Sequence, residues 1–354
     1  MNVKFLDAIS TLFTLQRWNF VPRIETWVEA ENVAYVLHLI YAVGRNANPN
    51  LDPPQIEKSL ARVLLKSFNK AYLSDISYYT REAIDKVKPG LWGDIEKDAA
   101  SKTLKLFPKE VHPYIKKNLI AGLSDPDDEK KIESKLVSYV QLEVARMERE
   151  TNKRGYPGNR YYLDLFTVLK GDVKRKRDVA HFRTSFARLD RYGDYIKNMK
   201  YLRRWNRLNR SVETSVMSHT FVVAALALVA ACIEVSYSKN KLPEDFIYRA
   251  VLRALFHDVP EVFTGDVVTP VKKNIEKLAK CRWSEIEKWR LVPLRDRKVT
   301  PKKLLDDIDH LELFSDLPSN KGDVVGKLVK DCDRLSLLLE CVFERSAGRT
   351  YGEM

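Results

Sequence analysis

Hydrophobic and polar positions along this chain follow helical spacing. Pro243-Glu244-Asp245 precedes apolar residues spaced at three and four positions, which predicts an amphipathic helix over about 243–255. Residues 215–233 are apolar nearly all round, as in a central buried helix. A third apolar stripe predicts a helix from about 323 to 345. Since no alternating run of useful length appears, the pattern predicts an all-α fold.

An internal repeat organises these helices. The segment Asp7–Asn19 matches Asp194–Asn206, with an Arg-Trp-Asn triplet at the end of each. The match continues in the same order: Arg23 with Arg210, Glu25-Thr26 with Glu213-Thr214 after a one-residue gap, Val63-Leu64 and Phe68 with Val251-Leu252 and Phe256, and Lys135–Val137 with Lys327–Val329. Collinear matches of this extent predict two copies of one helical domain, which could pair as an internal pseudo-dimer.

The predicted domain boundaries follow from the repeat. Residues 1–150 form the first copy, 151–190 a basic connecting segment, and 191–354 the second copy. The segment Thr151–Gly158, with its Gly and Pro residues, is interpreted as the break between them. The run Lys174–Arg177 is interpreted as a solvated linker.

Composition narrows the class of protein and its partners. At 45 % hydrophobic and 31 % charged residues, the sequence is typical of a soluble globular protein, and a cytoplasmic location is expected. The four cysteines include no CxxC pair, which argues against a disulfide framework or a thiolate zinc site. A net charge of +13 favours anionic partners but selects no function.

Two histidines and their acidic neighbours are the candidate chemistry. His257-Asp258 ends an amphipathic helix just before Pro260, where both side chains can face one cavity. His219 lies in the predicted buried helix, where a polar side chain needs a partner. Either feature alone is weak, because a lone histidine in an apolar helix is more often a hydrogen-bonded core residue. Their order, followed by an acid on a later helix, is that of the HD superfamily.

The residues between these positions resemble the bacterial 5′-deoxynucleotidase family of HD phosphohydrolases over about 192–350. The resemblance is carried by Arg204-Trp205, Glu213, His219, the stretch from His257-Asp258 through Glu261 and Asp266 to Lys272, and Val329–Leu335. It implies an all-α HD domain whose metal ligands are His219, His257, Asp258 and Asp333. Asp331 competes with Asp333, since each lies about a quarter turn from the apolar stripe. Helical phase does not decide between them, and only the resemblance favours Asp333.

Two imidazoles and two carboxylates form a mixed nitrogen–oxygen donor set. Such a set suits one divalent Mn, Fe, Co, Ni or Zn ion better than Mg, and leaves positions for water and a phosphate oxygen. The resemblance further implies that Glu261 handles a proton, that Asp266 handles a proton or contacts the sugar, and that Arg204 binds phosphate. It also implies that Trp205 packs on the sugar and helps exclude a 2′-hydroxyl. Lys272 is a further candidate for binding substrate. The alternatives are a surface salt bridge for Arg204 and a core anchor for Trp205, because Trp18 takes the same place in the first copy.

The first copy lacks the ligands. The sequence alignment places Glu31 where His219 is, Asn69-Lys70 where His257-Asp258 are, and Gln141 where Asp333 is. A lysine would put positive charge where a cation should bind. The first copy is therefore interpreted as degenerate and non-catalytic. The other four histidines match no ligand position.

Three classes of function remain open from sequence. The first is a phosphohydrolase of deoxynucleoside 5′-monophosphates, or its variant acting on deoxynucleoside triphosphates, which Lys272-Lys273 keeps open. The second is an HD nuclease on single-stranded nucleic acid, which the charge supports but no RNA-binding signature accompanies. The third is a nucleotide-sensing regulator with the first copy as sensor. A nucleotide substrate, a homo-oligomer or internal pseudo-dimer and no membrane are the expected partners.

Overall fold

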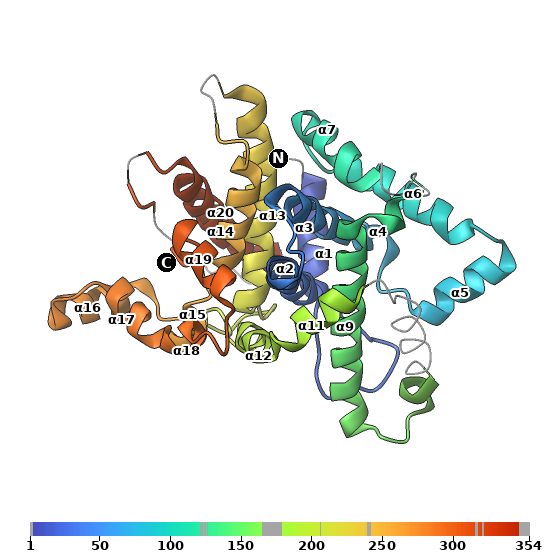
Figure 1. The fold of residues 1–354 in the computed structure, drawn as a ribbon, viewed down its shortest axis with the longest axis horizontal. Coiled ribbons are helices and arrows are strands. Elements are labelled where there is room, and N and C mark those ends of the chain that lie inside the picture. The colour runs from blue at the N-terminus through green and yellow to red at the C-terminus, as the bar shows by residue number, and fades with distance from the viewer. Residues whose placement is uncertain are drawn as a thin grey trace. The chain divides into compact units, whose positions relative to one another are not determined.

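The computed structural model describes residues 3–120, 123, 125, 127–164, 179–205, 207–238, 242–315, 318–320 and 322–346. The described residues form helices, and their only extended pairings are two isolated bridges, Gln16 with Val28 and Arg203 with Ser215. The predicted all-α fold is confirmed (Figure 1). The chain divides into two compact units, residues 1–184 and 185–354, which are called unit 1 and unit 2.

Unit 1 is built around three helices that pack on one another, α2, α3 and α9. Its α-helices are α1 (Val3–Thr14), α2 (Glu29–Asn46), α3 (Pro53–Ser67), α4 (Lys70–Leu73), α5 (Tyr78–Val87), α6 (Leu91–Leu104), α7 (His112–Ile115), α9 (Ile132–Gly155) and α11 (Ala180–Ala187), the last crossing the division between the units. Three short elements complete it: the 3₁₀ turns η1 (Lys109–Val111) and η3 (Asp128–Lys130), and the π turn η2 (Lys116–Ile120).

Helix α9 runs through the first part of the predicted break, as far as Gly155. The chain beyond it still packs on unit 1, because the Tyr162 carbonyl accepts a hydrogen bond from Arg149 Nε at 2.6 Å and the Tyr162 ring contacts Trp18. The basic run Lys174–Arg177 lies outside the described residues.

Unit 2 has the same kind of centre, formed by α13, α14 and α20, which pack on one another (Figure 1). Its helices are α12 (Asp190–Asn198), α13 (Val216–Tyr237), α14 (Phe246–Phe256), α15 (Glu261–Thr264), α16 (Thr269–Ala279), α17 (Trp283–Arg290), α18 (Val292–Arg295), α19 (Lys302–His310) and α20 (Val324–Ser346). The three helices predicted from apolar spacing correspond to α13, α14 and α20.

Helix α13 is the centre of unit 2. It begins after Ser215, whose side chain accepts a hydrogen bond from the backbone N–H of Ser218 and so caps the helix. By length and hydropathy α13 could cross a membrane, but 89 % of its most apolar window is buried inside unit 2. It is therefore the core helix that its apolar sequence predicts, and it carries His219 into the interior.

Candidate metal centre and its surroundings

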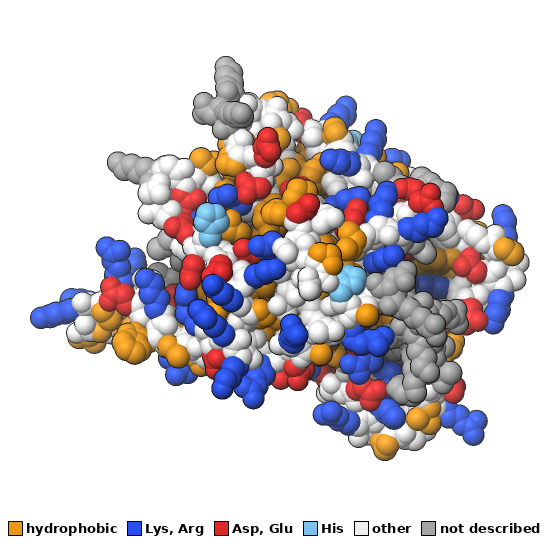
Figure 2. Space-filling model, viewed as in Figure 1, with side chains coloured by type: hydrophobic (Ala, Val, Ile, Leu, Met, Phe, Trp, Pro, Cys, Tyr) orange, Lys and Arg blue, Asp and Glu red, His pale blue; other side chains and the backbone are white. Residues whose placement is uncertain are grey.

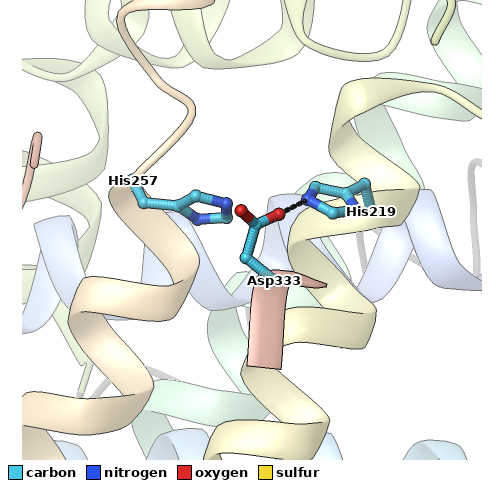
Figure 3. A group of neighbouring side chains, drawn as sticks. All are labelled: His219, His257 and Asp333. Atoms are coloured by element: carbon cyan, nitrogen blue, oxygen red, sulfur yellow. Dashed lines mark hydrogen bonds and ion pairs between the residues drawn. The ribbon is translucent and has the colours of Figure 1, made fainter. Parts of the chain in front are cut away.

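The four predicted metal ligands come together from three places around the core of unit 2. His219 projects from α13, His257 follows the last turn of α14, and Asp333 projects from α20 (Figure 3). Asp258 comes directly after His257. His219, His257 and Asp333 each offer a ligand atom within 4.8 Å of the other two. The Asp258 carboxylate lies 3.3 Å from His257 Nε2 and 3.5 Å from His219 Nε2. The geometry thus gathers two imidazoles and the Asp333 carboxylate, with the Asp258 carboxylate beside both imidazoles.

The tautomer of His257 follows from its hydrogen bond. His257 Nδ1 lies 2.7 Å from the backbone carbonyl of Ala254, which can only accept, so Nδ1 carries the proton. In the neutral ring Nε2 is then a bare acceptor, and this buried atom has no hydrogen-bond partner. A buried acceptor facing two carboxylates is an unfavourable arrangement unless a cation or a proton lies between them.

His219 is held in the same manner by a different set of groups. Its Nδ1 lies 3.0 Å from the Ser336 hydroxyl and 3.3 Å from Glu340 Oε1, while its Nε2 faces Asp333 Oδ1 at 3.1 Å. Burial and the positive charge of Arg204 lower the pKa of His219, but hydrogen bonds to Asp333 and Glu340 outweigh them and raise it to about 9. The surrounding carboxylates therefore make this a strongly cation-attracting position.

The two aspartates that sequence could not separate lie in different environments on α20. Asp333 faces His219, and its other carboxylate oxygen accepts a hydrogen bond from Lys330 Nζ at 2.9 Å. Burial alone would raise the pKa of Asp333, but the two histidines and Lys330 lower it strongly. Asp331 is exposed and pairs with Arg334 at 3.2 Å. Only Asp333 therefore lies within the cluster.

Glu340 lies further along α20 than Asp333. Its carboxylate contacts side chains that are predicted to bind substrate. It is 1 % exposed, and its carboxylate accepts a hydrogen bond from Trp205 Nε1 at 2.6 Å and lies 3.2 Å from both Arg204 and Arg210. Burial raises the pKa of Glu340, but the charge of Arg204 and the hydrogen bonds from His219 and Trp205 lower it to about 2. The sequence analysis missed Glu340, although the repeat contains a glutamate at the matching position of the first copy, Glu148.

Arg204 and Trp205 border the cluster. Arg204 Nη1 is 3.7 Å from Asp258 Oδ2, so the guanidinium lies beside a predicted ligand rather than in a surface salt bridge. Trp205 has a backbone φ of 57°, which is unusual for a residue other than glycine, and its side chain is only partly buried.

Glu261, Asp266 and Lys272 lie beyond Asp258 on the chain. A turn formed by the Glu261 N–H and the Asp258 carbonyl, 3.0 Å apart, brings Glu261 to the start of α15. Burial, followed by the negative charges of Asp258 and Asp266, raises the pKa of Glu261 well above its usual value, and Glu261 Oε2 is buried without a hydrogen-bond partner. Lys272 Nζ lies 3.6 Å from Glu261 Oε1. Gly265 has a φ of +77°, which allows the turn that returns Asp266 towards this group.

Comparison with known proteins gives the family of this part of the chain. Residues 191–351 match the family model of YfbR-like 5′-deoxynucleotidases. The 5′-deoxynucleotidase YfbR of Photorhabdus temperata is 30 % identical over 164 residues, covering 44 % of this chain and 74 % of that protein. The chain belongs to the YfbR-like 5′-deoxynucleotidase family. Two further relatives are the 5′-deoxynucleotidases of Escherichia coli O127:H6 (32 % identical over 157 residues, 44 % and 72 % covered) and Yersinia pestis (34 % over 155 residues, 44 % and 73 % covered). The resemblance inferred from motifs is thereby confirmed, and the family region lies within unit 2.

Unit 1 repeats the contacts around the family site with other side chains. Trp18 has the same φ of 57° as Trp205, and its indole N–H donates a hydrogen bond to Glu148 as that of Trp205 does to Glu340. Arg17 N donates to the carbonyl of Trp27 at 2.8 Å, as Arg204 N does to that of Thr214 at 2.9 Å.

These contacts correct one detail of the sequence alignment. The bridges Gln16–Val28 and Arg203–Ser215 enclose loops of equal length, so no one-residue gap is needed there. Asn32, rather than Glu31, therefore takes the place of His219. The Asn32 side chain donates a hydrogen bond to Glu148 Oε1 at 2.6 Å, as expected from the contact between His219 and Glu340. The gap was wrong because it aligned two identical Glu-Thr pairs instead of the turn.

Proposed function

We propose that unit 2 hydrolyses the phosphate ester of deoxynucleoside 5′-monophosphates at a site that holds one divalent transition metal ion. The observation that carries this proposal is the convergence of His219, His257 and Asp333, with Asp258 beside both imidazoles and the buried Nε2 of His257 without a hydrogen-bond partner. The named activity of three relatives supports the choice of substrate.

The donor set fits a metal of the Mn, Fe, Co, Ni or Zn group. Imidazole nitrogen favours these ions over Mg, and both histidines use their Nδ1 atoms for hydrogen bonds that leave Nε2 for the ion. Bound there, such an ion would supply a water of lowered pKa and would neutralise charge on the phosphate.

The surrounding side chains have separate parts in the reaction. Arg204, held between Asp258 and Glu340, offers N–H groups to the phosphate oxygens. Glu261 retains a proton at a higher pH than an ordinary carboxyl because it is buried among acids, so its Oε2 can donate that proton to the leaving 5′-oxygen. Lys272 stabilises the carboxylate that remains. Asp266 assists by keeping the pKa of Glu261 high.

A screen of nucleotides tests this proposal directly. With Mn or Co added, the full chain should release phosphate from deoxynucleoside 5′-monophosphates faster than from ribonucleotides or triphosphates, as measured by inorganic phosphate. Chelation should remove the activity, and Mn, Co, Ni and Mg, added in turn, should restore it to different extents, least with Mg. Preferential cleavage of triphosphates would replace this substrate by the triphosphate alternative. No phosphate release from any nucleotide with any of these metals would contradict the proposal.

Trp205 is expected to distinguish deoxyribose from ribose. Its counterpart Trp18 is covered by Tyr162 within a small core cluster, whereas the Trp205 side chain remains partly accessible. Trp205→Phe should lower the ratio of kcat/KM for deoxyadenosine 5′-monophosphate to kcat/KM for adenosine 5′-monophosphate by about tenfold. The smaller phenyl ring leaves more room for the 2′-hydroxyl and therefore excludes ribose less well. Trp18→Phe is the matched control and should leave the ratio unchanged. An unaltered ratio in Trp205→Phe would return Trp205 to the role of a core anchor.

The nuclease alternative has less support. On the face drawn in Figure 2, the Lys and Arg side chains of the described residues are spread among Asp and Glu side chains and form no single basic stripe. A nucleic-acid site would gather its cations along a backbone track.

A further inference from the structure

Unit 1 contains a cavity at the position that matches the family site of unit 2. Its walls include Arg17, Asn32, Asn69, Lys70 and Gln141, which stand where Arg204 and the four predicted ligands of unit 2 stand. The empty volume is about 920 Å³, which includes space open to solvent. Unit 1 thus has a cavity at this position, lined by side chains that differ from the predicted metal ligands of unit 2.

The replacements do not suit a cation. Two amides and a lysine stand where an imidazole pair and an aspartate would hold the ion, and a third amide replaces the last carboxylate. Lys70 Nζ lies 2.7 Å from Glu29 Oε2, and Arg17 lies 3.2 Å from the same glutamate. The acid that lines this part of the cavity is therefore already occupied by two cations.

Two hydrogen-bond donors at the cavity are buried and have no partner. Asn69 is 2 % exposed; its Oδ1 accepts a hydrogen bond from Thr103 at 2.7 Å, which fixes the amide and leaves Nδ2 unpaired. Arg81 Nε is likewise buried and unpaired, and the Arg81 guanidinium lies over the Trp92 ring at 5.0 Å. Unpaired buried donors are costly unless an acceptor meets them.

We propose that this cavity binds the phosphate group of a nucleotide directly, without a metal ion. Asn69 Nδ2 and Arg81 donate to phosphate oxygens. Lys66 and Lys70 line the same cavity and pair with its two acids, Lys66 with Glu96 at 3.0 Å and Lys70 with Glu29 at 2.7 Å. With Arg17 and Arg81, the cationic side chains of the lining outnumber these two acids. Trp92 supplies an aromatic face, and Val33, Val36 and Ile76 supply an apolar wall for the base and sugar. The choice of a nucleotide over another phosphate compound rests on the function proposed for unit 2.

The test uses the full chain in excess chelator, so that binding is measured without metal and without turnover. Deoxyadenosine 5′-monophosphate is titrated calorimetrically, with inorganic phosphate and deoxyadenosine as separate arms. We expect the nucleotide to bind, the nucleoside to bind at least about tenfold more weakly, and inorganic phosphate to compete, since the recognised group is charged.

Variants locate the binding. Arg81→Ala and Asn69→Ala should each weaken the nucleotide by about tenfold or more, since each removes a donor to a charged oxygen. Lys86→Ala, on the same helix α5 but exposed and paired with Glu82, should bind as the parent does. His257→Ala, in unit 2, should also leave this binding unchanged. Arg81→Lys keeps the charge without the planar guanidinium and separates specific donation from general attraction.

The proposal fails if the nucleotide does not bind in chelator, if the nucleoside binds equally well, or if His257→Ala abolishes binding and Arg81→Ala does not. Phosphate release with added metal is measured on the same variants. Because Arg81→Ala is expected to retain that activity, a failure of the unit 1 site and a failure of the hydrolase proposal give different results.

Discussion

Asp333→Asn is expected to abolish phosphate release and metal binding while leaving unit 2 folded. The carboxylate faces His219 Nε2 at 3.1 Å, and the amide would present a weaker donor to a cation and remove a negative charge. Loss of a metal-derived stabilisation of several kcal/mol corresponds to a fall in kcat/KM of roughly 10³-fold or more. Activity with saturating Mn and metal retained after dialysis are the two measurements.

Asp331→Asn is the matched control on the same helix. Asp331 is exposed and pairs only with Arg334, also exposed, so its loss should change activity and metal content by less than about twofold. If Asp331→Asn behaved like Asp333→Asn, or if Asp333→Asn held as much metal as the parent, the assignment of the fourth ligand would be wrong. Asp258→Ala, which removes the other carboxylate near both imidazoles, should lose metal as Asp333→Asn does.

This pair of aspartates also marks the limit of what sequence could predict. Apolar spacing located α13, α14 and α20 because burial of a helical stripe depends on residue type at fixed intervals. It could not choose between Asp331 and Asp333, since each borders the stripe on one side. That choice depends on the rotation of α20 against α13, which is set by packing between helices and is visible only in three dimensions.

The internal repeat predicted most of the residues of the first copy that stand at the ligand positions, but it was wrong at one of them. It identified the replaced ligands Asn69, Lys70 and Gln141, but a chance pairing of identical residues shifted the equivalent of His219 to Glu31. The turn after Trp18 shows that Asn32 is the equivalent of His219. This turn is defined by backbone hydrogen bonds, which do not depend on which side chains are present. The cavity of unit 1 was also beyond sequence, because a pocket depends on which side chains stay apart.

Glu340→Gln is expected to destabilise unit 2 strongly. The substitution keeps the shape of the side chain but leaves the partly buried cations Arg204 and Arg210 without their shared carboxylate. Removing one partner from a buried ion pair typically destabilises a protein by about 3–5 kcal/mol. We therefore expect the free energy of unfolding of unit 2, measured in urea, to fall by that amount. The lowered pKa of Glu340 also predicts a pH dependence. The contribution of the Glu340 carboxylate to the free energy of unfolding is complete above about pH 4.5 and is lost as the pH falls through about 2.

Glu148→Gln provides the comparison within the same chain. Glu148 accepts from Trp18 and pairs with Arg17 at 3.1 Å, so unit 1 should lose comparable stability, of the order of 3 kcal/mol. Activity separates the two variants, because Glu340 also positions His219 Nδ1 and Trp205. Glu148 instead accepts hydrogen bonds from Arg17, Trp18 and Asn32 of unit 1. Glu340→Gln should therefore lower kcat in metal by about 10- to 100-fold, as losses of groups that orient metal ligands do. Equal activity in the two variants would mean that Glu340 serves only to hold the fold together.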